Sequence, residues 1–110
     1  MYPGVVTSSP IPPALLAHLR QQAAALDLPA QAEASWRQCF RNVEGRTIGG
    51  WREADLWGRL RSVQLQTTHQ VTFEVSLDLF AHTDPEGSQR IFQYHLVVCP
   101  DGEAWDDWLF

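Results

Sequence analysis

Apolar side chains recur every three or four residues in the first half of the chain, which is the spacing of one face of an α-helix. One such stretch runs from Pro13 to Leu26, and a Pro suits a helix start because its missing N–H would have no partner there. A second stretch begins at Pro29. Its apolar stripe consists of Ala32, Trp36, Cys39, Phe40 and Val43. The sequence therefore predicts two consecutive helices, the second ending near Val43 before Gly45.

The second half alternates between apolar and polar residues, which is the pattern of a half-buried strand. Residues 71–82 alternate throughout, and residues 91–99 alternate again. Between them, Asp84-Pro85-Glu86-Gly87 has the residue types of a type I turn. After a turn at residues 100–102, the last eight residues form either a short strand or one to two helical turns.

Residues 53–67 fit two patterns. Leu56, Leu60 and Val63 have helical spacing, whereas residues 59–67 alternate. We favour a short turn at residues 53–56 followed by a strand. Before it, the Gly-rich segment 45–51 contains two adjacent glycines, which indicate a sharp turn.

Burial of the apolar faces also predicts the strand register, because a slip of one residue would expose every apolar side chain. Four pairs bring apolar residues together in the main hairpin: Leu77 with Tyr94, Phe73 with Val98, Val75 with Leu96 and Leu79 with Phe92. The same argument pairs Val63 with Val75 and Leu65 with Phe73, with residues 68–70 as the loop.

These elements predict an α+β fold with two N-terminal helices packed on one face of a three- to four-stranded antiparallel meander sheet. A length of 110 residues suits one such domain, which we assign to residues 13–110. Residues 1–12 contain three Pro and are expected to form a flexible arm.

Composition bears on the location and source of the protein and on the chemistry open to it. No apolar run approaches the ~20 residues needed to span a bilayer, and the first 13 residues lack the features of a secretory signal. We expect a cytoplasmic protein with no membrane contact.

All eight basic residues are Arg, which excludes lysine-based chemistry. The absence of Lys is typical of a GC-rich coding genome, so we expect a bacterial source. Cys39 and Cys99 lack metal-ligand spacing and are expected to be reduced thiols, and we predict no metal site and no cofactor.

The polar face of the predicted sheet carries one candidate group for acid–base chemistry. The register places His95 opposite Ser76, with Glu74 and Asp78 on its diagonals. A His beside carboxylates suits general acid–base work, with Asp78 and His95 as the pair. The same imidazole and carboxylates could instead hold a metal ion. We favour a third interpretation, an ordinary solvated sheet face.

Charge and aromatic residues supply the candidates for partner binding. Residues 36–61 have a net charge of +3 and residues 62–110 a net charge of −7. Arginines in the basic segment and aromatic residues near the C-terminus suit a protein partner. The alternatives are burial of the aromatic residues in the core and arginines that belong to an ordinary solvated surface. The candidate partner-binding residues are Trp51, Trp105, Trp108, Phe110, Arg46, Arg52 and Arg59. The acidic remainder of the chain argues against nucleic acid, although Arg with aromatics can bind single strands.

The favoured hypothesis is therefore a small non-catalytic protein-interaction module, such as an adaptor, assembly factor or regulator. An uncovered sheet edge would also allow a homodimer. The order helix–helix–sheet, ending in Asp101-Gly102-x-x-Trp105, resembles nuclear-transport-factor-like and cystatin-like domains. That resemblance implies a pocket between helices and sheet, and hence a small-molecule-binding or acid–base alternative. A nucleic-acid binder using residues 36–61 is the second alternative.

Overall fold

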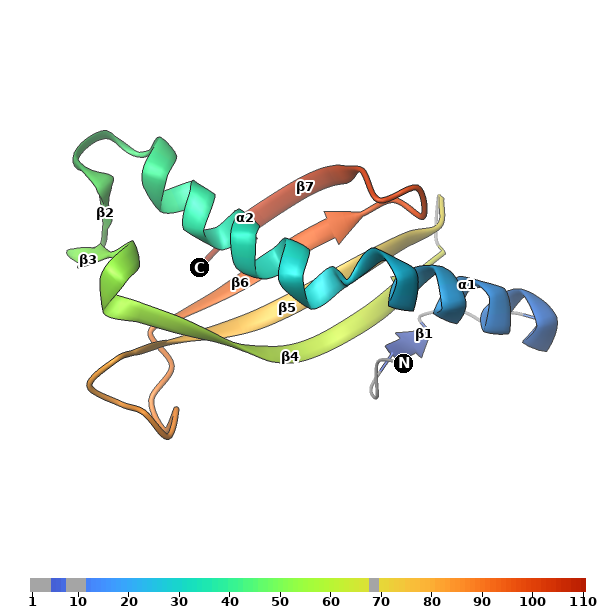
Figure 1. The fold of residues 1–110 in the computed structure, drawn as a ribbon, viewed down its shortest axis with the longest axis horizontal. Coiled ribbons are helices and arrows are strands. Elements are labelled where there is room, and N and C mark those ends of the chain that lie inside the picture. The colour runs from blue at the N-terminus through green and yellow to red at the C-terminus, as the bar shows by residue number, and fades with distance from the viewer. Residues whose placement is uncertain (1–4, 8–11, 68–69) are drawn as a thin grey trace.

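The computed structural model describes residues 5–7, 12–67 and 70–110. Two helices lie on the same side of a five-stranded sheet, so the α+β prediction is confirmed (Figure 1). The elements are β1 (Val5–Thr7), α1 (Pro13–Leu26), α2 (Leu28–Asn42), η1 (Glu44–Arg46), β2 (Thr47–Ile48), β3 (Trp51–Arg52), η2 (Glu53–Asp55), β4 (Leu56–Gln66), β5 (Thr72–Ala81), β6 (Phe92–Val98) and β7 (Ala104–Leu109). No helix in these ranges is long and apolar enough to cross a membrane.

The main sheet has the order β1-β4-β5-β6-β7, and its last four strands form an antiparallel meander. Every residue pair predicted from burial is present, including Leu77 with Tyr94 and Val63 with Val75. Strand β1, within the predicted arm, pairs in parallel with β4 and was not anticipated. Residues 1–4 and 8–11 of the arm, and Thr68 and His69 of the predicted loop, lie outside the described residues.

Helix α2 supplies most of the helical contribution to the core. Ala32, Trp36 and Phe40 of its stripe are fully buried against the sheet, whereas Val43 follows the helix end and is exposed. Helix α1 buries only Leu19 and Ala23, and in Figure 1 it continues past the ends of the strands. Asp27, in a left-handed conformation (φ 49°), separates the two helices.

Gly58 of β4 lets α2 pack closely on the sheet. A side chain at this position would meet the Trp36 Nε1 atom at 3.2 Å and Leu79 at 3.3 Å. A glycine inside a strand is typical of such a close approach. Gly49 and Gly50 serve another purpose, because both have positive φ and form the two-residue turn between β2 and β3.

The ambiguous segment is a strand, preceded by the turn η2 as predicted. A β-bulge at Arg61 shifts the register of β4 between Leu60 and Ser62. Before the bulge, Leu60 pairs with Leu77, and after it Val63 pairs with Val75. The alternation of residues 59–67 would have placed Arg59 and Arg61 on the core side with Val63. The bulge instead directs both arginines toward the polar face, because it changes the phase of the strand.

Candidate functional site

Strand β7 and the residue that follows it, Phe110, present the most exposed aromatic side chains of the described residues. Trp105 and Phe110 are each 63% exposed, and Trp108 is 38% exposed. The final residues thus form a strand, which was one of the two predicted alternatives. The strand lies at one edge of the sheet and pairs with β6, while β1 lies at the opposite edge (Figure 1). Three candidate partner-binding residues are therefore gathered at one sheet edge.

The ring of His95 connects β6 to this edge. It stacks on Trp108 and on Phe110, with ring centroids 5.1 Å apart in both pairs. Its Nδ1 atom lies 3.0 Å from Glu74 Oε1 and 2.9 Å from Ser76 Oγ. The carboxylate places the proton on Nδ1, because an ionised carboxylate only accepts hydrogen bonds.

The predicted acid–base group is only partly assembled. Glu74 contacts His95, but Asp78 faces Arg90 at 3.3 Å and Arg61 at 3.6 Å. The reason is the bulge, which brings Arg61 beside Asp78. The Nε2 atom of His95 is buried and has no hydrogen-bond partner among the described residues. A general acid or base must reach a substrate atom, which the buried Nε2 atom does not favour. The contacts of His95 instead suit a structural role, in which its ring holds β7 in place.

Replacing His95 with Ala is expected to loosen the C-terminal strand. Two stacked rings and one charge-assisted hydrogen bond disappear, at a cost of about 1–3 kcal/mol in the free energy of unfolding. The Phe110 amide, which donates to the Gln93 carbonyl at 3.0 Å, should then exchange its hydrogen faster. His95→Phe keeps a ring and should retain most of the protection. Unchanged hydrogen exchange of the Phe110 amide in His95→Ala would contradict this structural role of His95.

A groove runs between α2 and β7 on the helix side of the sheet. Its volume is about 530 Å³. Its lining residues are Ser35, Gln38, Cys39, Asn42, Leu96, Ala104, Trp105, Asp106 and Asp107. The polar residues of α2 that line the groove were not among the predicted site residues. They could have been identified from a second stripe at helical spacing beside the apolar one, which consists of Ser35, Gln38 and Asn42.

The floor of the groove holds a hydrogen-bonded cluster. Asp107 Oδ2 accepts from Tyr94 Oη at 2.7 Å and from Cys39 Sγ at 3.2 Å. Burial, followed by the contact with Asp107, raises the pKa of Cys39 to about 11 and also raises the pKa of Tyr94. The thiol therefore stays protonated near neutral pH, which disfavours nucleophilic chemistry. Cys39 and Cys99 are both free, as predicted.

The arginines of the basic segment are largely engaged within the protein. Arg59 lies over the ring of Phe80 at 4.5 Å and donates to the carbonyls of Glu86 and Gly87. Arg52 lies 3.7 Å from Asp55. A small groove of about 210 Å³ is lined by Phe40, Arg41, Arg46, Arg52, Glu53 and Ala54. Trp51, another candidate, is half-buried and packs against the core.

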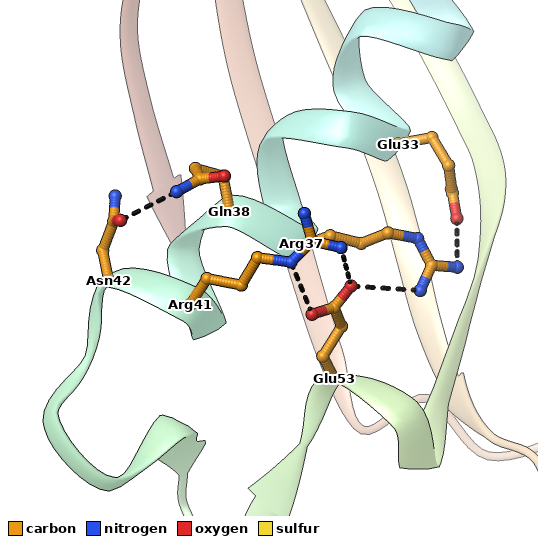
Figure 2. Close-up of polar contacts among 6 residues, drawn as sticks. All are labelled: Glu33, Arg37, Gln38, Arg41, Asn42 and Glu53. Carbon is orange, nitrogen blue, oxygen red and sulfur yellow. Dashed lines mark hydrogen bonds and ion pairs between the residues drawn. The ribbon is translucent and has the colours of Figure 1, made fainter.

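Glu53 joins η2 to the C-terminal half of α2 (Figure 2). It accepts from Arg41 at 2.8 and 3.0 Å and lies 3.7 Å from Arg37, which also pairs with Glu33 at 2.9 Å. Because the pairs share Glu53 and Arg37, ordering one side chain helps to order the next. The same view shows Gln38 donating to Asn42 on the groove side of the helix.

Acid is expected to weaken this network at Glu53. The hydrogen bond from Arg41 is the largest cause that holds the pKa of Glu53 below its usual value. Stability from a lowered pKa is present above the unfolded value, about 4.3, and is lost as pH falls through the folded value. Urea unfolding from about pH 6 to about pH 3 should therefore show a weaker acid dependence in Glu53→Gln. Glu44→Gln is the control, and equal slopes in all three proteins would contradict the assignment.

Comparisons with family models, with curated proteins and with solved structures found no match to this chain. The likeness to nuclear-transport-factor-like and cystatin-like domains therefore rests on element order alone.

Proposed function

We propose that this chain is a small protein-interaction module that docks a partner protein at strand β7. The observation that carries the proposal is the exposure of Trp105 in β7 and of Phe110 directly after it, where β7 pairs with β6 alone among the strands of the described residues. Large aromatic side chains supply much of the binding energy at protein interfaces. A sheet edge offers backbone hydrogen-bonding groups beside them.

The two alternatives have less support. The acid–base hypothesis needs an accessible His95, but two aromatic rings stack on the imidazole and its second nitrogen is buried. The nucleic-acid hypothesis needs arginines available to phosphates. Arg37, Arg41 and Arg59 are instead held by carboxylates or backbone carbonyls of the chain itself.

The test is partner capture from the source cells with the tagged full chain, followed by mass spectrometry. A specific partner should be retained by the unaltered chain and lost when Trp105 and Phe110 are both replaced with Ala. Retention of every specific partner by that double variant would refute the proposal, because the aromatic edge would then be dispensable.

A further inference from the structure

The outer edge of β7 has backbone groups that face away from the sheet. Phe110 and Gln93 exchange both of their backbone hydrogen bonds, at 2.8 and 3.0 Å. In an antiparallel pair such exchanges recur at every second residue, so Trp108 also bonds toward β6. The N–H and C=O groups of Asp107 and Leu109 therefore point outward, where another strand would pair.

One of these outward groups is capped within the strand itself. The Asp107 N–H donates to Asp106 Oδ1 at 2.9 Å. A carbonyl from an added strand would replace this carboxylate as the acceptor. The Asp106 carboxylate would then turn to a donor on the incoming chain, so an added strand should supply a positive charge nearby.

The surroundings of the edge are strongly acidic. Residues 91–110 contain no Arg and no Lys but carry four carboxylates, at Asp101, Glu103, Asp106 and Asp107. None of these four has an ion pair with a residue in the described ranges. A second copy of β7 would bring further acidic side chains to the same edge, and like charges across a strand pair are destabilising.

The groove between α2 and β7 lies beside the β7 edge, on the side of the sheet that the helices cover. Side chains of an added strand alternate in direction, so every second one would point toward this side of the sheet. There the groove offers the amides of Gln38 and Asn42, the ring of Trp105 and the Asp107 carboxylate. An Arg or Lys suits this lining, because its head can bind carboxylate or stack on an indole ring.

We infer that the β7 edge binds an extended segment of a partner protein that carries Arg or Lys at alternate positions and adds to the sheet as a sixth strand. This inference rests on the proposed function and specifies the chemistry of the partner. Backbone hydrogen bonds would supply pairing along the edge, and the groove with its acidic surroundings would select basic side chains.

Three synthetic peptides of about eight residues test the inference. The first, acetyl-TRVRVRVT-amide, alternates Arg with Val, and the second has Glu in place of each Arg. The third keeps the Arg side chains but carries an N-methyl group on every arginine and every valine, which removes the backbone donors from both edges of the peptide. Titration calorimetry gives the Kd of each peptide for the full chain, and amide hydrogen exchange locates the contact.

The Arg peptide should bind at least about 10-fold more tightly than either of the other two peptides. It should slow exchange at the Leu109 amide, which faces outward, and leave the inward-facing Trp108 amide nearly unchanged. Asp106→Asn should weaken binding several-fold and reduce its dependence on salt. Glu86→Gln removes an exposed carboxylate in the β5–β6 loop. It should change neither the affinity for the Arg peptide nor the dependence of that affinity on salt.

Several results would overturn the inference. These are equal binding of the Glu peptide or of the N-methylated peptide, a Kd of the Arg peptide weaker than about 1 mM, or protection at another edge. Dimerisation of the full chain through β7, measured by sedimentation, would also overturn it. If the peptides fail but Trp105 and Phe110 are still needed for partner capture, the proposed function stands and only the strand-addition inference is lost.

Discussion

Replacing Trp105 and Phe110 with Ala is expected to weaken binding of the captured partner by about 100-fold or more. Truncation of an interface hot spot costs about 2 kcal/mol or more, and each 1.4 kcal/mol is a factor of ten in Kd. Both side chains are 63% exposed. Trp105 lines the groove, and the ring of Phe110 stacks on that of His95.

The design separates a binding effect from a folding effect. Trp105→Ala alone should leave the free energy of unfolding within about 0.5 kcal/mol, because an exposed side chain contributes little packing. Phe110→Ala also removes its stacking on His95, so a loss of about 1 kcal/mol is expected there. Surface plasmon resonance with the identified partner measures Kd. Leu15→Ala and Leu60→Ala, exposed apolar residues elsewhere, are the matched controls and should bind normally.

Replacing Trp36 with Ala is expected to lower the free energy of unfolding by about 3–5 kcal/mol. Trp36 is the largest fully buried side chain in the core. Its ring packs edge-on against Phe40, with centroids 5.8 Å apart, and the Arg37 guanidinium lies 4.4 Å from its centroid. Removal leaves a cavity between α2 and β4. Because small domains have only about 5–15 kcal/mol of stability, much of the total would be lost.

Trp36→Phe is the matched control for this cavity. It keeps an aromatic ring and removes the indole N–H, which is buried with no hydrogen-bond partner among the described residues. An unsatisfied buried donor is costly, so its removal should offset part of the lost packing. Urea unfolding followed by circular dichroism measures both variants. A loss below about 1 kcal/mol in Trp36→Ala would show that α2 does not anchor the core.

The strand register could be predicted because one face of the meander is apolar throughout. Along β5, a shift of one residue would replace Phe73, Val75 and Leu77 with Glu74, Ser76 and Asp78 at the helices, which leaves one acceptable pairing with β6. Strand β1 could not be predicted in the same way. It has three residues in a Pro-rich segment and pairs in parallel with a distant strand, so its local sequence carries little signal.

The candidate site was harder to predict because its contacts depend on details that alternation does not encode. Sequence spacing made Glu74 and Asp78 equivalent diagonal neighbours of His95, but the arginines beside Asp78 leave only Glu74 to the imidazole. The groove depends on the approach of α2 to β7, two elements far apart in the sequence. The exposure of the C-terminal aromatics, in contrast, follows from their place in the last strand.

The bulge of β4 explains why residues 53–67 fit both a helical spacing and a strand alternation. Leu56, Leu60 and Val63 have helical spacing, yet all three belong to the core side of a strand, because the chain contains one surplus residue between Leu60 and Val63. A version of the protein without Arg61 would keep these side chains in step with β5. Position 61 is therefore a point where the length of the chain can vary by one residue while Leu56, Leu60 and Val63 keep their partners in β5, at the expense of the pairing of Arg61 with Asp78.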